Sequence, residues 1–358
     1  MKKFLLVVGT RPNFIKVAPL YRALKARGAE ITLVHTGQHF SPGMSDVFFT
    51  ELEIPEPHVH LGIGAGDRVT QTRKIIIALS EYLRQNPHDR VVVFGDVMST
   101  AAAAIAAVQS DVPVAHVEAG LRSFHWPMPE ELNRMIADHH ADMLFVTEPS
   151  GVENLRNEAI PEERIHFTGN IMIDSLRHAE QVAWRSPILT TLGLPPQSYG
   201  VLTLHRPENV DQRHTFEPLW AALGQAASRI PLVLPLHPRT KERLVQYGLP
   251  TPPGIRVIDP IGYIDMLALT KNAKFVMTDS GGLQEESYAL GIPCITLRGQ
   301  TERPITVDFG TNEVVGRDRA KILDAVERIL LGRWKQGVLH PLWDGHASER
   351  IADILMRQ

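Results

Sequence analysis

Carboxylates recur where three stretches of the sequence pass from apolar to polar residues. Asp96 follows the run Val91–Gly95, Glu118 ends the run that begins at Pro113, and Glu130 opens a helical stretch soon after. Asp96 alone could cap a helix, and an acid in a first helical turn favours the helix dipole. Helix stability does not explain why carboxylates recur at neighbouring strand ends. Carboxyl groups can act as general acids and bases in proton transfer. In a cluster they raise one another's pKa, so that one of them can hold a proton while another accepts one.

A glycine followed by cations suggests an anion site after the first apolar run. Gly9 is followed by Arg11, Pro12 and Lys16, so a tight turn would lead into a helix N-terminus with free N–H groups. Such a terminus with two cations could cradle a phosphate or diphosphate. A capped helix with two solvated cations is the alternative. The string is not GxGxxG, so a nicotinamide cofactor gains no support.

A second and more specific anion site is predicted at Ser280, Gly281 and Gly282. The glycine pair lets a phosphate approach the backbone, and the serine hydroxyl can donate a hydrogen bond. Glu286, one turn into the following helix, is placed to accept hydrogen bonds from ribose hydroxyls. Arg303 follows the next strand and adds a cation at the same edge.

Histidine also stands at predicted strand ends. His205 precedes Arg206 after the first strand of the second half, and His237 follows the next strand. A ligand or proton-handling role for His205 competes evenly with a structural one. We assign no metal and no cofactor, because the other histidines lack a metal-binding spacing such as HExxH; packing or surface roles are expected for His58, His60, His139 and His140.

Two sets of alternating strands and helices must position these residues. Runs continuous in Val and Ile, separated by helical stretches, predict parallel sheets covered on both faces. The first set is expected at residues 4–8, 31–35, 91–95, 113–117 and 143–146, and the second at 201–204, 232–236, 255–258, 274–277 and 294–297. We therefore predict an α/β protein of two Rossmann-like, doubly wound domains with a central cleft. Ligands of such sheets bind beyond the C-terminal strand ends.

The expected domains are residues 1–172 and 173–345, the second binding the nucleotide. The stretch Arg185–Ser198, with its Gly and Pro residues, is the best linker candidate. A last helical pattern at 346–358 could pack back on the first domain.

Composition narrows the class of protein further. The chain has 358 residues, 44% of them hydrophobic and 22% charged, which is typical of a globular protein of two domains. The formal net charge of −3 gives no general attraction to nucleic acid. Phe4–Val8 is too short for the apolar core of a signal peptide, and no run would cross a membrane. We expect a cytoplasmic protein. The single cysteine, Cys294, excludes an internal disulfide.

Together these strings resemble the non-hydrolysing UDP-N-acetylglucosamine 2-epimerase family. The similarity spans nearly the whole chain, in the family's order and spacing, at residues 9–16, 95–96, 117–123, 129–134, 205–206, 279–286 and 301–304. The resemblance implies the GT-B arrangement of two Rossmann-like domains, a homodimer, and inversion at C2 of a UDP-sugar, between UDP-GlcNAc and UDP-ManNAc. It places Asp96, Glu118, Glu130 and His205 at catalytic positions. It places the substrate- and UDP-binding positions at Arg11, Lys16, Arg134, His237, Ser280, Gly281, Gly282, Glu286 and Arg303.

The sequence departs from the family pattern in three places, each of them after a predicted strand. Asn13 stands where the family usually has glutamate, and Pro207 stands where many members have arginine. Some bacterial members bind an activating UDP-GlcNAc through a Gln-His-Arg-Gln loop, and here Phe40 and Ser41 replace its last two residues. This change puts an allosteric site in doubt.

The chemistry of C2 inversion explains the combination of acids and anion sites. The C2 hydrogen has no neighbouring carbonyl, so cleavage of the anomeric C–O bond must come first and make it acidic. UDP then leaves, C2 loses its proton to give a 2-acetamidoglucal, and UDP adds again. A GT-B glycosyltransferase, a hydrolysing relative, a 2-epimerase for another nucleotide sugar and a nucleotide-sugar sensor are the alternatives. The glycosyltransferase and the sensor have no need of three acids around C2, and the hydrolysing relative is distinguished by its products.

Overall fold

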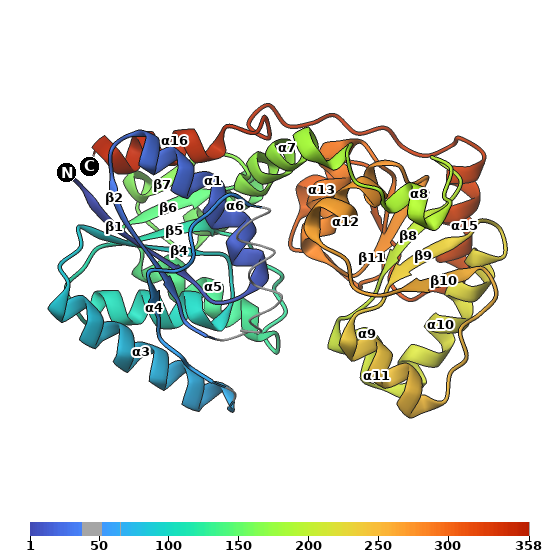
Figure 1. Cartoon of the computed structure of the whole chain (residues 1–358), viewed down its shortest axis with the longest axis horizontal. Coiled ribbons are helices and arrows are strands. Elements are labelled where there is room, and N and C mark those ends of the chain that lie inside the picture. The colour runs from blue at the N-terminus through green and yellow to red at the C-terminus, as the bar shows by residue number, and fades with distance from the viewer. Residues whose placement is uncertain (38–51, 65, 358) are drawn as a thin grey trace. The chain divides into compact units, whose positions relative to one another are not determined.

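The computed structural model describes residues 1–37, 52–64 and 66–357 of the chain. The chain divides into two compact units, and Figure 1 shows that each contains a sheet with helices packed around it. Unit 1 comprises Met1–Arg177 and Pro341–Gln358, and unit 2 comprises His178–His340. The substitutions in the expected Gln-His-Arg-Gln loop, at Phe40 and Ser41, lie outside the described residues.

Unit 1 is built on a parallel sheet with the strand order β3-β2-β1-β4-β5-β6-β7. The strands are β1 (Lys3–Val8), β2 (Glu30–His35), β3 (Val59–His60), β4 (Arg90–Phe94), β5 (Val114–Ala119), β6 (Met143–Val146) and β7 (Ile165–Phe167). The helices are α1 (Arg11–Ala26), α3 (Arg68–Gln85), α4 (Met98–Val108), α5 (Pro129–His140), α6 (Pro149–Asn157), α7 (Ile171–Ala183), which runs into unit 2, and α16 (Ala347–Arg357), with a 3-10 turn at Glu162–Arg164.

The alanine-rich helix α4 sets how closely the helices of unit 1 pack. Its alanines from Ala101 to Ala104 are buried, and the helix packs between α3 and α5 (Figure 1). Alanine combines strong helix propensity with a small side chain, so the backbones of α3 and α5 come close on either side. This packing fixes the N-terminal ends of α4 and α5 next to the strand ends that carry the predicted acids.

The last residues of the chain belong to unit 1. Helix α16 lies against α1 (Figure 1). Asp174 of α7 accepts hydrogen bonds from the backbone N–H groups of Ala347 and Ser348 at 3.1 and 2.6 Å, and so caps the start of α16. The fully buried Trp343 donates from Nε1 to the carbonyl of Thr147 at 2.8 Å. The C-terminal segment is therefore held by packing and by hydrogen bonds.

Unit 2 repeats the design with the strand order β10-β9-β8-β11-β12-β13. Its strands are β8 (Gly200–Thr203), β9 (Leu232–Pro235), β10 (Ile255–Ile258), β11 (Phe275–Thr278), β12 (Cys294–Thr296) and β13 (Asn312–Val314). Its helices are α8 (Ile188–Leu192), α9 (Pro207–Val210), α10 (Arg213–Ala227), α11 (Pro238–Tyr247), α12 (Tyr263–Lys271), α13 (Gly281–Leu290), α14 (Pro304–Asp308) and α15 (Arg319–Leu330). A large apolar core packs α10 and α15 on one face of this sheet, and a smaller one packs α8, α12 and α13 on the other.

The predicted fold class, with two parallel sheets, is confirmed, and all ten expected strands are present within one or two residues at each end. The sequence analysis missed β3, β7 and β13, which are only two or three residues long. The linker prediction is wrong: Arg185–Ser198 contains α8 and lies inside unit 2. Among the helices of the described residues, none combines the length and hydropathy that a membrane span requires.

In both sheets, strand order reverses between two adjacent strands. These are β1 and β4 in unit 1, and β8 and β11 in unit 2. A reversal separates the helices that follow the two strands, which leaves a crevice for ligands at the C-terminal strand ends. The predicted site residues follow these strands or their neighbours.

Candidate functional site

Glu118 is held in an unusual backbone conformation at the end of β5. Its φ is 74°, in the left-handed region that a residue with a side chain rarely adopts. The pairing of β5 with β6 shifts register between Val117 and Ala119, so Glu118 lies at a bulge. Bulges and strained residues often re-aim a side chain next to an active site.

The buried carboxylate of Glu118 forms an ion pair with Lys16 of α1. Gly95, after β4, makes room for this pair. A Cβ at Gly95 would lie 2.6 Å from Lys16 Nζ and 3.1 Å from Glu118 Oε2, and the φ of Gly95 is 64°. Lys16, which the sequence analysis assigns to nucleotide binding, therefore has an acid as its partner here.

Asp96 and Arg134 form the second ion pair of this edge. Asp96 Oδ2 lies 2.5 Å from an Arg134 guanidinium nitrogen, and Asn133 donates to the Asp96 carbonyl at 2.9 Å. Arg134 also pairs with Glu131 at 2.7 Å and is almost wholly buried. Asp96 and Glu131 therefore compensate the positive charge of Arg134, a residue that the resemblance assigns to substrate binding.

Of the adjacent glutamates in α5, Glu131 has the structural role. Its carboxylate accepts hydrogen bonds from the backbone N–H groups of Ser123 and Phe124 and from the Ser123 hydroxyl, at 2.8–3.1 Å. Burial alone would raise the pKa of Glu131, but these bonds and Arg134 hold it below its ordinary value. Glu131 thus fixes the loop between β5 and α5 and leaves Glu130 as the candidate for chemistry.

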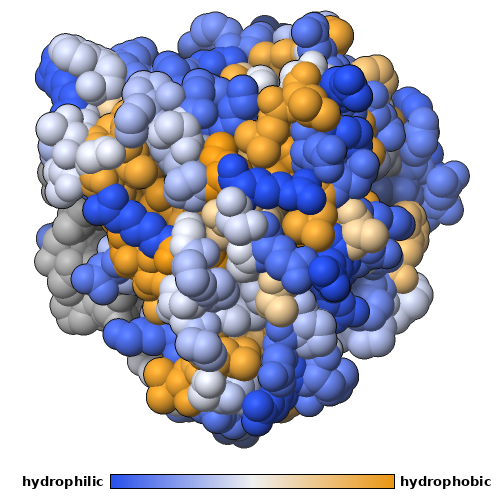
Figure 2. Space-filling view, turned by 90° about the vertical axis from the view of Figure 1, so that its right-hand side faces the viewer, coloured by the Kyte–Doolittle hydropathy of each residue, from blue (hydrophilic) through white to orange (hydrophobic). Residues whose placement is uncertain are grey.

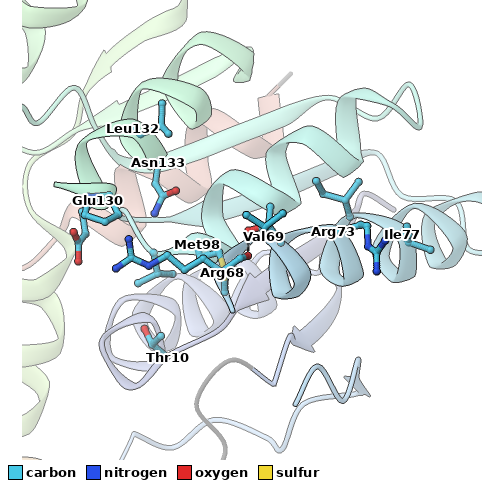
Figure 3. Close-up of a pocket in the computed structure, with 13 residues that line it drawn as sticks. Thr10, Arg68, Val69, Arg73, Ile77, Met98, Glu130, Leu132 and Asn133 are labelled. Carbon is cyan, nitrogen blue, oxygen red and sulfur yellow. Dashed lines mark hydrogen bonds between the residues drawn. The ribbon is translucent and has the colours of Figure 1, made fainter. Parts of the chain in front are cut away.

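Glu130 lines a pocket of about 680 Å³ within unit 1 (Figure 3). Helices α3, α4 and α5 and the start of α1 form its walls. In Figure 3 the side chain of Arg68 points toward Glu130, with Thr10 and Asn133 nearby. The pocket thus combines a carboxylate, a cation and hydrogen-bonding groups.

Asn13, which stands where the family usually has glutamate, is held by hydrogen bonds to both the oxygen and the nitrogen of its amide group. Its side-chain oxygen accepts from the N–H groups of Gly9 and Thr10 at 3.2 and 3.1 Å, and its NH₂ donates to the carbonyl of Phe94 at 3.0 Å. An amide can donate and accept at once, so Asn13 joins the turn after β1 to the end of β4. The side chain of Arg11 lies outside the part of the chain that the structure describes.

In unit 2, Asp279 holds His205 in place. Asp279 Oδ1 lies 3.0 Å from His205 Nδ1, and Oδ2 accepts from the N–H groups of His205 and Arg206 at 2.9 and 2.8 Å. Burial opposes the charged form of Asp279, but these bonds from His205 and Arg206 lower its pKa. The ring of His237 lies 5.2 Å from that of His205 between centroids. The structure thus brings His205 and His237 together, with Asp279 as a partner that the sequence analysis missed.

The serine and glycine pair expected to bind an anion lie at the start of α13, next to an acidic side chain. Ser280 precedes the helix, and its N–H donates to Thr278 Oγ1 at 2.9 Å. A Cβ at Gly281 would lie 3.1 Å from Glu302 Oε1, so a carboxylate packs against the glycine pair. Glu302 pairs in turn with Arg298 at 2.7 Å.

Arg303 is not an isolated cation at this edge. Its guanidinium lies 2.7 Å from Glu285 and 3.8 Å from Glu302, and all three side chains are buried. Its charge is thus largely compensated inside unit 2. The sequence analysis could not detect this pairing, because ion-pair partners on different elements leave no spacing signal.

Glu286 is buried beside Tyr263 of α12. Burial raises the pKa of Glu286 to about 7, and a hydrogen bond from the Tyr263 hydroxyl offsets part of that effect. Burial also raises the pKa of Tyr263. Glu286 is therefore poised to change charge near neutral pH, a property that sequence spacing does not reveal. Within the described ranges, no group of three or more His, Cys, Asp or Glu residues could hold a metal ion.

Comparison with known proteins agrees with these motifs. A family model described as UDP-N-acetylglucosamine 2-epimerase matches residues 22–356. The UDP-N-acetylglucosamine 2-epimerase of Methanocaldococcus jannaschii is 38% identical over 362 residues, which cover 99% of this chain and 98% of that protein. A Pseudomonas aeruginosa protein named UDP-2,3-diacetamido-2,3-dideoxy-D-glucuronate 2-epimerase is 40% identical over 361 residues, which cover 99% of each.

A solved structure matches equally well. The crystal structure of the M. jannaschii UDP-GlcNAc 2-epimerase in complex with UDP-GlcNAc and UDP has a TM-score of 0.91 and 38% identity, and the match covers 99% of this chain and 100% of that one. Both the family model and these relatives span nearly the whole sequence. The chain therefore belongs to the UDP-N-acetylglucosamine 2-epimerase family, as its motifs predict.

Proposed function

We propose that this protein inverts C2 of UDP-GlcNAc to give UDP-ManNAc, reversibly, by elimination of UDP and its re-addition. The observation that carries the proposal is the strained, buried Glu118, ion-paired with Lys16 at the end of β5. A carboxylate held in this way is suited to proton transfer. The M. jannaschii relative whose structure contains UDP-GlcNAc and UDP supports the choice of nucleotide sugar.

In the proposed first step, the anomeric C–O bond breaks and its electron pair leaves with UDP. The N-terminus of α13, with Ser280, Gly281 and Gly282, would stabilise the negative charge that develops on the diphosphate. Arg11, Arg303 and His237 are further proposed contacts to UDP, with Glu286 accepting from ribose hydroxyls. His205, oriented by Asp279, would act near the leaving diphosphate.

In the second step, C2 loses its proton to a carboxylate and forms the 2-acetamidoglucal. Return of a proton to the opposite face of C2 and re-addition of UDP at C1 complete the inversion. Two faces require groups on both sides of C2, so we assign the transfers jointly to Asp96, Glu118 and Glu130. Each transfer group contributes about 10²–10⁴-fold to the rate in enzymes of this kind. Glu118 pairs with Lys16 and Asp96 pairs with Arg134, so each of these two acids has a cation beside it.

A second substrate deserves a direct comparison. The P. aeruginosa relative is as similar as the archaeal one and is named for a diacetamido glucuronate sugar. Epimerisation at C2 is common to both names, whereas the groups at C3 and C5 of the sugar differ. The names of the two relatives therefore support the reaction at C2 in common, whereas they differ in the sugar on which it takes place.

Proton NMR in D₂O with each of the two UDP-sugars tests the proposal. We expect UDP-GlcNAc to equilibrate with UDP-ManNAc, with deuterium at C2 of both and no free sugar. Release of ManNAc with UDP would indicate a hydrolase instead. Conversion of the diacetamido glucuronate sugar alone would keep the reaction type and replace the substrate.

We also propose that the active protein is a cytoplasmic homodimer, as the family resemblance implies. On the face seen in Figure 2, hydrophobic residues form small separate groups among hydrophilic ones, so this face offers no broad apolar surface for association. Light scattering coupled to gel filtration gives the oligomeric state, and a monomer mass of 39.9 kDa across the working concentration range would contradict the dimer. Cell fractionation tests the location.

A further inference from the structure

A network of four titratable side chains, three of them buried, lies next to the ends of β4 and β5, where Asp96 and Glu118 stand. His116 and Asp138 are fully buried, and Arg122 nearly so. His116 Nδ1 lies 2.7 Å from Asp138 Oδ1, and Arg122 lies 2.7 Å from Asp138 Oδ2 and 2.7 Å from Glu158. The proposed mechanism uses none of these groups directly.

The network joins the two loops through backbone atoms. His116 Nε2 lies 2.7 Å from the carbonyl oxygen of Gly95, the residue before Asp96. Asp138 Oδ2 accepts from the N–H of Gly120 at 3.1 Å, two residues after Glu118. A continuous chain of hydrogen bonds therefore runs from Gly95 through His116 and Asp138 to Gly120.

The atoms that this chain holds flank a strained residue in the sequence. Gly95 and Gly120 have φ values of 64° and 81°, which glycine adopts readily, but Glu118 has a φ of 74°. For a residue with a side chain, such a conformation persists only where the surroundings determine it. Each glycine is also fixed on its other side, because Gly95 N–H donates to Val117 and the Gly120 carbonyl accepts from Asn154, both at 2.9 Å.

The partners of His116 decide its protonation. A peptide carbonyl can only accept a hydrogen bond, so His116 Nε2 must carry a proton. An ionised carboxylate can also only accept, so Nδ1 must carry one as well. Asp138 Oδ2 accepts hydrogen bonds from Arg122 at 2.7 Å and from the N–H of Gly120 at 3.1 Å, and these two donors stabilise the ionised carboxylate independently of His116.

We infer that His116 is a buried imidazolium that, with Asp138, acts as a positioning pair for the proton-transfer loops of Asp96 and Glu118. The inference rests on the proposed function for its effect on rate, but not for the protonation of His116. As an imidazolium, His116 would join Arg122 as a second cation facing the carboxylates of Asp138 and Glu158; the exposed His139 also lies 3.8 Å from Glu158. Loss of the Nε2 proton would break the hydrogen bond to Gly95, next to Asp96. Loss of the Nδ1 proton would break the bond to Asp138, which holds Gly120 near Glu118.

Two substitutions separate the two hydrogen bonds. Asn retains a donor near the Nδ1 position and Gln retains one near Nε2, so His116→Asn keeps the bond to Asp138 and His116→Gln keeps the bond to Gly95. If both bonds are required, each variant loses about 10- to 100-fold in kcat, the usual effect of removing a group that orients an active-site ligand or side chain. The Kd for UDP, measured by calorimetry, should not change, because most of the proposed UDP contacts lie in unit 2 and His116 is not among them.

His88 provides the matched control. It is partly buried at the opposite end of β4, and its two ring nitrogens lie 2.8 and 3.1 Å from the Asn86 carbonyl and the Thr32 hydroxyl. His88→Asn and His88→Gln should keep the wild-type kcat. An unchanged kcat in both His116 variants would overturn the positioning role.

A spectroscopic measurement on the wild-type protein remains decisive if the variants do not fold. In ¹⁵N-detected imidazole correlation spectra at neutral pH, with the His116 signal assigned by its loss in a variant or by selective labelling, we expect both ring nitrogens to show the shift of a protonated nitrogen. One protonated and one unprotonated nitrogen would overturn the inference. A wild-type protein without epimerase activity would instead contradict the proposed function, and the spectrum would still report on His116.

Discussion

In each unit, several of the predicted site residues form ion pairs that cross from one element to another. Lys16 pairs with Glu118, Asp96 with Arg134, and Arg303 with Glu285. The residue types and their places at strand ends could be predicted from the sequence. Their partners could not, because each pair joins elements far apart along the chain, and only the folded structure decides which groups meet.

The adjacent glutamates of α5 give a prediction at this scale. Glu131→Gln should lower the free energy of unfolding by about 1–3 kcal/mol, because the buried carboxylate accepts bonds from Ser123, Phe124 and Arg134. Glu130→Gln should leave stability unchanged and reduce kcat, because Glu130 lines the pocket. Urea unfolding and steady-state kinetics of both variants provide the measurements. Equal stability losses in the two variants would contradict this division of roles.

Glu286 predicts a pH dependence of stability. Its pKa of about 7 in the folded protein lies above the ordinary value of 4.5, so the folded state binds the proton more tightly than the unfolded state. The free energy of unfolding should therefore fall as the pH rises from about 4.5 to 7, by roughly 3 kcal/mol in total for this group. Below that range both states are protonated, and above it the loss is complete.

Urea denaturation of the wild type and of Glu286→Gln at pH 5 and pH 8 measures this effect. The wild type should lose more stability than the variant between the two values, because glutamine does not ionise. Parallel losses in both proteins would show that Glu286 does not carry the shift.

At the scale of elements, the strand ends set the positions of the chemistry. Apolar runs made ten strands predictable, since a strand buried on both faces is apolar throughout. The edge strands β3, β7 and β13, of two or three residues, escaped prediction because they are short and none of them is buried throughout. The bulge at Glu118 also escaped it, because an ordinary residue with positive φ leaves no mark in the sequence.

The return of the C-terminal segment to unit 1 gives a prediction at the same scale. Trp343 is fully buried and donates to the Thr147 carbonyl. Trp343→Ala should cost about 3–5 kcal/mol in the free energy of unfolding, which is typical of truncating a large core side chain. Trp343→Phe keeps an aromatic ring and should cost less. Similar stabilities of the alanine variant and the wild type in urea would contradict the docking role of this residue.

The whole molecule repeats one design in two units. Each unit places its polar residues at the C-terminal ends of a parallel sheet, near the reversal of strand order. Unit 1 carries the carboxylates and unit 2 the α13 terminus, so the proposed chemistry divides between them. The repeat could be predicted from the two sets of strands. The chain enters unit 2 within α7, the helix that also contains the expected boundary between residues 172 and 173, whereas Arg185–Ser198, the expected linker, lies inside unit 2.

Deuterium incorporation at C2 by Glu118→Gln tests the central claim most directly. Glutamine keeps the size of the side chain but cannot accept a proton from C2. We predict that the variant binds UDP as the wild type does, while exchange at C2 of UDP-GlcNAc in D₂O falls by about 10²–10⁴-fold. Exchange at the wild-type rate would contradict a proton-transfer role for Glu118 and, with it, this account of the reaction.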